Sequence, residues 1–148
     1  MNKSVNDVAL KMKNHFGGDT EKIQHFVRVY TIAKSIGELE KLPEITQEYL
    51  ELAALMHEIE GEDKIQTAKE ILISCDVDDD TALRVCHIIE NLHCYDRITG
   101  LDHQILIEAD MIVTFKESGT KTEEIIRIAN ERFITNYGKA FLKKAFNI

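Results

Sequence analysis

A single proline, Pro43, and seven glycines are spread over 148 residues, and this scarcity of chain-breaking residues is what most constrains the fold. Stretches without proline or glycine favour helices joined by short turns. The clearest helical period runs from about Asp19 to Lys41, where apolar residues recur three or four positions apart. Because no stretch shows a useful length of strand alternation, the sequence predicts an all-α fold.

Turn and cap residues divide the chain into about seven or eight expected helices. Aspartate favours a helix start, proline suits the first turn, and glycine favours a helix end. Most expected segments can be delimited: Asn6 to Phe16, about Asp19 to Lys41, Pro43 to His57, the Asp78–Asp80 cap to about His93, the Thr99–Asp102 break to Gly119, Thr120 to about Asn136, and Gly138 to the end. With no internal repeat or low-complexity linker, we expect one domain over residues 1–148.

Composition excludes several classes of protein. The net charge of −8 argues against a nucleic-acid polymer as partner, because phosphate backbones attract basic surfaces. No apolar run approaches the roughly 18 residues that span a bilayer, so we expect no membrane association. Three cysteines without CxxC pairing, and no apolar signal segment after Lys3, favour a cytoplasmic protein with reduced thiols. The sequence leaves open whether the chain forms a homo-oligomer.

Four polar residues interrupt or end apolar runs. His57 and Glu58 follow the run Leu52–Met56, His25 lies in an apolar helical stretch, and Asp110 lies in the run 105–113. Buried ionisable groups need partners, and a metal ion is one of the few that satisfies several at once. Two imidazoles and two carboxylates suit a divalent ion such as Mn, Fe, Ni, Co, Zn or Mg.

The order and surroundings of these residues resemble the H…HD…D signature of the HD-domain metal-dependent phosphohydrolases. The segment 25–29, His-Phe-Val-Arg-Val, is similar to the family's H-x-x-R-V helix. The segment 52–59, Leu-Ala-Ala-Leu-Met-His-Glu-Ile, is similar to its L-A-A-L-L-H-D-I-G motif, and 107–111 is similar to its A-D helix. The resemblance covers roughly residues 19–117, leaving 120–148 as closing helices. It implies that His25, His57, Glu58 and Asp110 hold the metal.

Glu58 departs from the family pattern, which has aspartate at this position. The extra methylene moves the carboxylate farther from the backbone, so Glu58 either binds the ion in a changed geometry or misses it. The ordinary alternatives are a solvated Glu58 at a helix end, a core His25 bonded to a backbone carbonyl, and Asp110 paired with Arg28 or Lys64.

Other residues have candidate roles beside the metal. Arg28 lies one turn after His25 and, with Lys64, is a candidate for binding phosphate. Glu62 or His93 is a candidate for orienting water or protonating a leaving group. Some members of the family bind a second metal through two further histidines. His93 lies where the later one is expected, but no histidine lies in 64–72, which favours a single ion.

The expected activity is metal-dependent hydrolysis of a phosphate ester or anhydride. The resemblance, not any single residue, implies a nucleotide or another small phosphorylated metabolite as substrate. The rival hypothesis is a degenerate HD-like domain that binds metal or nucleotide as a sensor or interaction module without turnover, and the replacement at Glu58 keeps that hypothesis open.

Overall fold

The computed structural model describes residues 2–148 and forms eight α-helices over that range, with no strand. The all-α prediction is therefore confirmed. The helices are α1 Lys3–Phe16, α2 Thr20–Leu39, α3 Glu44–Met56, α4 Lys64–Ser74, α5 Asp79–Glu90, α6 Leu101–Ser118, α7 Thr122–Arg132 and α8 Asn136–Phe146.

Three helix boundaries are set by the capping residues that the sequence predicted. The carboxylates of Asp19 and Asp78 accept backbone N–H groups at the first turns of α2 and α5. Gly119 ends α6 in the left-handed conformation, with φ of 60°. These three boundaries agree with the sequence prediction, whereas α4 had not been delimited from the sequence.

Two helices end earlier than predicted. α5 ends at Glu90, because the Asn91 side chain donates to the carbonyl of His87 and the chain then turns. His93 therefore lies in a turn, and an argument about its face on a helix does not apply. α7 ends at Arg132, because the backbone N–H groups of Ile134 and Thr135 are bound by the Glu108 carboxylate of α6.

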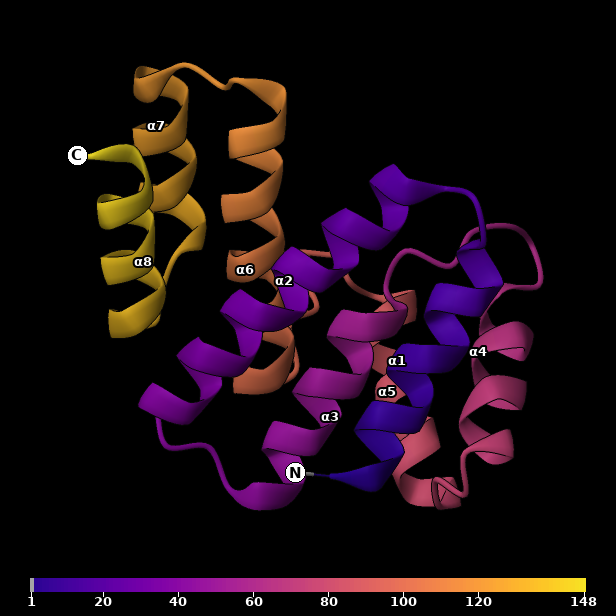
Figure 1. The fold of residues 1–148 in the computed structure, drawn as a ribbon. Helices are drawn as coiled ribbons and strands as arrows, with labels where there is room; N and C mark the ends of the chain where they lie inside the picture. Colours follow the sequence, from indigo (N-terminus) through magenta and orange to yellow (C-terminus); the bar gives the residue numbers. More distant parts are fainter. Residues whose placement is uncertain (1) are drawn as a thin grey trace.

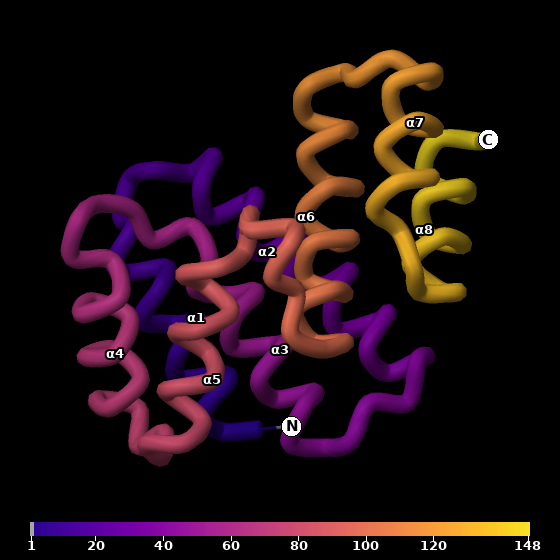
Figure 2. Tube along the Cα trace, turned by 180° about the vertical axis from the view of Figure 1, so that it is seen from behind, coloured from indigo at the N-terminus to yellow at the C-terminus, as the bar shows by residue number. Residues whose placement is uncertain are grey.

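The long helix α6 joins two parts of the fold. α2 packs against both α3 and α6, and α3 also packs against α5 and α6. In Figure 1, α1, α4 and α5 lie on one side of α3, while α7 and α8 lie beyond α6 at the opposite side of the molecule. The reverse view in Figure 2 shows the same separation. The segments around residues 25, 57 and 110 meet where α2, α3 and α6 come together.

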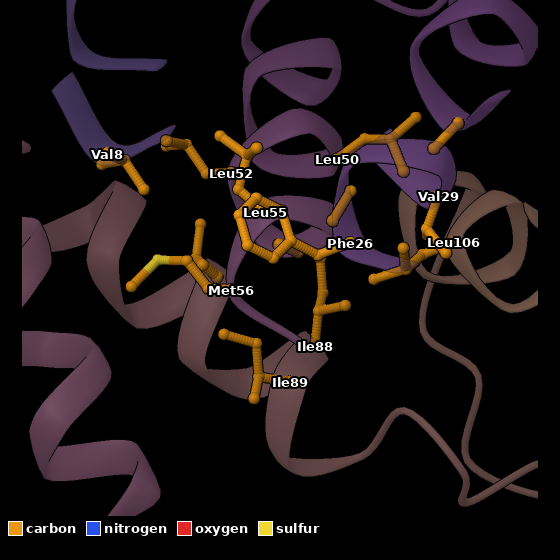
Figure 3. Close-up of a cluster of buried hydrophobic side chains, with 14 of the residues drawn as sticks. Val8, Phe26, Val29, Leu50, Leu52, Leu55, Met56, Ile88, Ile89 and Leu106 are labelled. Carbon is orange, nitrogen blue, oxygen red and sulfur yellow. The ribbon is translucent and has the colours of Figure 1, made fainter. Parts of the chain in front are cut away.

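The larger hydrophobic core fills the space among α1–α6. Phe26, Leu52, Met56 and Ile88 are fully buried within it and converge in Figure 3. A smaller core, which includes Phe115 and Leu142, joins α6 to α7 and α8. Met111 of α6 packs against both cores, so the C-terminal pair of helices is continuous with the rest of the structure.

The buried carboxylate of Glu108 ties α6 to the turn between α7 and α8. It accepts hydrogen bonds from the Gln104 side chain, from the backbone N–H groups of Ile134 and Thr135, and from the Thr135 hydroxyl, at 2.6–3.1 Å. A Cβ at Gly138 would overlap this carboxylate, so the close approach requires glycine there. These contacts set the position of α7 relative to α6.

The segment between α5 and α6 is held at both ends. The backbone carbonyl of Asn91 lies 3.0 Å from His103 Nε2, and Arg84 donates to Thr99 Oγ1 and to both carboxylate oxygens of Asp102. The turn that carries His93 and Tyr95 is therefore fixed against α6.

Two further observations concern the expectations about membrane spans and cysteines. Among residues 2–148, no helix has both the length and the apolar composition that crossing a bilayer requires. Cys75, Cys86 and Cys94 are free thiols.

Candidate metal centre

His25, His57, Glu58 and Asp110 meet at one point between α2, α3 and α6. One ligand atom from each residue can be chosen so that all four lie within 4.8 Å of one another. The Nε2 atom of His25 is 3.0 Å from Asp110 Oδ1 and 3.3 Å from Glu58 Oε1. The Nε2 atom of His57 is 3.3 Å from Glu58 Oε1 and 3.5 Å from Asp110 Oδ1. The four residues singled out from the sequence are thus brought together.

His57 is oriented by the end of its own helix. It follows the last residue of α3, where carbonyl groups lack intrahelical partners, and its Nδ1 atom lies 2.6 Å from the carbonyl oxygen of Ala54. If Nδ1 donates that hydrogen bond, the lone pair of the neutral ring is on Nε2. The Nε2 atom is buried and points into the cluster. Glu58 Oε1 lies 3.3 Å away, but no described residue meets the geometry of a hydrogen bond to Nε2.

His25 is oriented by a residue that the sequence analysis did not select. Its Nδ1 atom lies 2.8 Å from Glu117 Oε1, near the C-terminal end of α6. A hydrogen bond from Nδ1 to this carboxylate leaves Nε2 to face the cluster. Metal-binding histidines characteristically donate their other ring N–H to a carboxylate or carbonyl in this way. Both histidines therefore have the outer partner that a metal ligand requires.

The longer side chain of Glu58 reaches the cluster. Its Oε1 atom is equidistant, at 3.3 Å, from the Nε2 atoms of His25 and His57. The side chain is 25% exposed, which places it at the edge of the cluster and not in bulk solvent. The departure from aspartate therefore leaves a carboxylate oxygen among the other three donors.

Asp110 and His25 also do not make the contacts expected of ordinary core residues. The partners of Asp110 are the two imidazoles, not Arg28 or Lys64. The partners of His25 are carboxylates, not a backbone carbonyl.

The charges of the cluster are strongly coupled. Burial disfavours a charged His57, but the carboxylates of Asp110 and Glu58 outweigh burial and raise its pKa to about 9. The Asp110 carboxylate also raises the pKa of His25 above its ordinary value, with Glu117 adding to the effect. In return, His57 lowers the pKa of Glu58. Burial opposes a charged Asp110, yet the two imidazoles hold the pKa of this carboxyl well below its usual range.

The raised imidazole pKa values and lowered carboxyl pKa values mean that the cluster favours binding of positive charge. In the protein without metal, the raised pKa of His57 keeps a proton on this imidazole at neutral pH, next to the carboxylates of Glu58 and Asp110. A divalent cation can replace that proton, because neutral imidazole and carboxylate are both metal ligands.

The donor atoms have the spacing that a single ion needs. Atoms that each lie about 2.1 Å from one ion are separated by about 3.0–3.5 Å at the angles of octahedral or tetrahedral coordination. The four imidazole–carboxylate separations of 3.0, 3.3, 3.3 and 3.5 Å match this spacing. Together with the partnerless Nε2 of His57, they show that the cluster could hold a metal ion.

Two cavities open beside the cluster. The first, of about 640 Å³, is lined by His25 and Glu58, by the helix cap Asp19 and by mostly charged residues of α2 such as Glu21 and Arg28. The second, of about 500 Å³, is lined by residues of α6 and α7 and includes three members of the cluster, His25, Glu58 and Asp110. Its remaining lining residues are His93, Tyr95, Met111, Thr114, Phe115, Arg127, Ile128, Glu131 and Arg132. A ligand in either cavity can reach the cluster.

The other predicted site residues are distributed unevenly around these cavities. Arg28 lines the first cavity, but its guanidinium lies 3.5 Å from Glu117 Oε2. His93 lines the second cavity. Glu62, exposed in the loop after α3, and Lys64, the first residue of α4, are not among the residues that line either cavity. The structure thus places Arg28 and His93 near the cluster, and does not bring Glu62 or Lys64 there.

Sequence reasoning missed Glu117, Tyr95 and Arg132. Glu117 lies 92 positions from its partner His25, and Arg132 stacks on Tyr95 with its Cζ atom 4.7 Å from the ring centroid. Burial and the Asp110 carboxylate raise the pKa of the Tyr95 phenol, while Arg132 opposes them. One signal was present: Glu117 follows Asp110 by seven residues, two helical turns along the same face.

Comparisons with known protein families, with curated proteins and with solved structures found no match to this chain.

Proposed function

We propose that this protein is a metal-dependent phosphohydrolase that acts on a small phosphorylated metabolite such as a nucleotide. The observation that carries the proposal is the convergence of His25, His57, Glu58 and Asp110, with the Nε2 atom of His57 buried and without a hydrogen-bond partner. The ordered resemblance to the HD-domain signature supports the same activity. The finer assignment of substrate rests on that resemblance.

The four residues would hold one divalent ion, through two imidazole nitrogens and two carboxylate oxygens. A bound ion would supply a Lewis acid that lowers the pKa of water and offsets the charge that develops on a phosphoryl oxygen. Glu117 and the Ala54 carbonyl hold the two imidazoles in the orientation that presents Nε2. Glu58 and Asp110 balance the charge of the ion.

His93 is the residue best placed to exchange a proton with the leaving group. It lines the cavity that also reaches His25, Glu58 and Asp110, and its ring packs edge-on against Tyr95 at 6.3 Å between centroids. Glu62 lines neither cavity, so the proposal gives it no role.

The test combines metal analysis with turnover. The purified full chain is analysed for metal and assayed with an aryl phosphomonoester, an aryl phosphodiester and a nucleotide panel, with Mn, Co, Ni and Mg added in turn. We expect close to one equivalent of metal, and hydrolysis that chelator abolishes. Asp110→Asn should lose both, whereas Asp80→Asn, which removes an exposed carboxylate of α5, should retain both.

Glu58 separates the enzyme from its rival. Glu58→Gln removes a negative charge with little change of shape and should weaken metal binding. Glu58→Asp should lower the hydrolytic rate, since a shift of roughly 0.5 Å matters in such sites. Tight metal binding without turnover for any substrate and ion would contradict the enzymatic proposal and favour a non-catalytic sensor.

A further inference from the structure

Arg132 is a cation without an anionic partner at the edge of the candidate metal centre. Its guanidinium makes no ion pair with any carboxylate of residues 2–148, and its side chain lies half-buried over the Tyr95 ring. A guanidinium held over an aromatic ring has a restricted position, and its planar set of donors suits bidentate contact with phosphate. Arg132 is therefore oriented but has no protein anion to contact.

Arg127, on the same helix and lining the same cavity, is in a different state. Its guanidinium pairs with Glu124 at 2.5 Å and with Glu131 at 3.4 Å, and its side chain is 56% exposed. The charge of Arg127 is thus already neutralised on the surface. The contrast identifies Arg132 as the arginine of this cavity that can meet an incoming anion.

The cavity combines charge with an apolar wall. His25, Glu58 and Asp110 line this cavity, and so do Arg132 and Tyr95. Met111, Phe115 and Ile128 supply apolar surface from α6 and α7. Its volume of about 500 Å³ falls within the range of small-molecule sites.

The first cavity has the opposite balance. Asp19, Glu21, Glu58 and Glu117 outnumber its two cationic residues, Lys22 and Arg28, and Arg28 is close to Glu117. In the second cavity, an ion in the cluster would balance Glu58 and Asp110. Arg127 and Glu131 pair with each other, which leaves Arg132 as the cation of this cavity without an anionic partner. An anion with an organic group is therefore better matched by the second cavity.

We propose that the cavity along α6 and α7 binds organic phosphates, with Arg132 contacting the phosphate and the wall of Met111, Phe115 and Ile128 contacting an apolar or aromatic group. Placement of the phosphoryl group beside the cluster rests on the proposed function, whereas the binding itself does not require turnover. Arg132, not Arg28, is then the arginine that contacts the phosphate of the ligand, and phosphates that carry a ring bind more tightly than inorganic phosphate.

Equilibrium binding tests this inference independently of hydrolysis. Phenylphosphonate and methylphosphonate both carry the anion on a carbon–phosphorus bond that resists hydrolysis, and they differ in the ring. Titration calorimetry measures their Kd for the full chain with Mn²⁺ and again with chelator. We expect the phenyl compound to bind about tenfold more tightly, as the burial of part of a ring implies.

Four variants assign the contacts. Arg132→Gln should raise the Kd of both phosphonates by about tenfold to a hundredfold, the range for losing a charge-assisted hydrogen bond. Arg132→Lys should recover part of this loss. Arg127→Gln, the matched removal of a charge from the same cavity, should change Kd by less than about threefold. Ile128→Ala should reduce the preference for phenyl over methyl, because it removes apolar contact that the ring uses more than the methyl group does.

Several outcomes overturn the inference. These are no binding of either phosphonate to the natural protein, equal Kd values for Arg132→Gln and the natural protein, or equal effects of Arg127→Gln and Arg132→Gln, which would indicate only bulk charge. Helix content and bound Mn²⁺ are measured for each variant, so loss of fold or metal is recognised. If binding depends on Arg132 but no metal supports hydrolysis, the inference stands and the proposed function fails. If hydrolysis occurs without dependence on Arg132, the reverse holds.

Discussion

Glu108 and Asp110 stand two residues apart on α6, and both are carboxylates in an apolar stretch, yet their surroundings differ completely. Two residues correspond to about 200° around a helix, so the two side chains leave opposite faces. Glu108 faces the turn between α7 and α8 and is fully buried, and Asp110 faces α2 and α3 and is 14% exposed. One helix thus places a carboxylate in each part of the fold.

The difference lies in the partners. Glu108 is surrounded by four protein donors, two of them backbone N–H groups, at hydrogen-bonding distance. Asp110 is surrounded by imidazoles, which change their charge with pH and bind metals. Backbone donors cannot be withdrawn, whereas protons on imidazoles can be exchanged for a cation. The comparison teaches that Glu108 has the surroundings of a carboxylate that holds the fold together, whereas Asp110 has those of a cluster that could hold a metal ion.

The largest expected effect is the loss of metal affinity when Asp110 is replaced. Asp110→Asn keeps the size of the side chain and removes a charged ligand. We expect metal affinity to fall by more than about a hundredfold, the upper range for loss of an outer-shell partner alone. Titration with Mn²⁺ or Co²⁺ measures it.

The same variant should leave the metal-free fold nearly intact. Glu58 and Glu117 remain to pair with the imidazoles, but a largely buried ion pair is lost, so the free energy of unfolding in chelator should fall by about 1–3 kcal/mol without loss of the fold. Unchanged metal occupancy in Asp110→Asn would contradict the assignment of this ligand.

Glu108→Ala should show the opposite pattern. It leaves buried donors of Gln104, Ile134 and Thr135 without an acceptor, at about 1–3 kcal/mol each. We expect a loss of about 3 kcal/mol or more in unfolding free energy, measured by urea denaturation in chelator. At temperatures where the variant is folded, it should still bind one equivalent of metal. Loss of metal from the folded variant would show that the two carboxylates are not independent.

A pH series sharpens the same contrast. In the metal-free protein, the pKa of His57 is raised to about 9, so at pH 6 to 8 a metal must displace its proton. Metal affinity should therefore rise with pH by about tenfold per unit across this window. A metal Kd independent of pH between 6 and 8 would argue against imidazole ligands.

The stability of the metal-free protein should change with pH in the opposite direction to metal affinity. A pKa raised above the unfolded value of about 6.5 stabilises the metal-free fold below that pH. This contribution is lost as pH rises through about 9. The free energy of unfolding in chelator should decline over pH 6.5 to 9, even while metal binds more tightly.

The helical fold and the four residues of the cluster were predictable because both depend on local sequence patterns. Helical periodicity identified α2, and ordered motifs identified His25, His57, Glu58 and Asp110. Helix ends were less predictable when a distant side chain decided them, as Glu108 does where α7 stops at Arg132. The role of Arg132 depends on how α7 packs beside Tyr95, and no sequence period encodes that contact.

Glu117 is the intermediate case, and its removal should have the smallest effect. It lies on the Asp110 face of α6, but it touches the cluster only through His25 Nδ1, at 2.8 Å. Glu117→Gln keeps a hydrogen-bond acceptor for the ring and removes the charge that adds to the raised pKa of His25. We expect metal affinity to fall by about tenfold, the lower range for such outer partners. Glu117→Ala, which also removes the acceptor, should cost more.

Arg28 is the control for this effect, because it also approaches Glu117, at 3.5 Å, without touching the imidazole. If Glu117 acts by orienting His25, Arg28→Gln should leave metal affinity within about twofold, as expected for an exposed ion pair. If Arg28→Gln weakens metal binding as much as Glu117→Gln does, the effect comes from the general electrostatic field of that surface. Isothermal titration with Co²⁺ measures the affinity and decides between the two. The visible spectrum of bound Co²⁺ reports separately whether the ligands around the ion have changed.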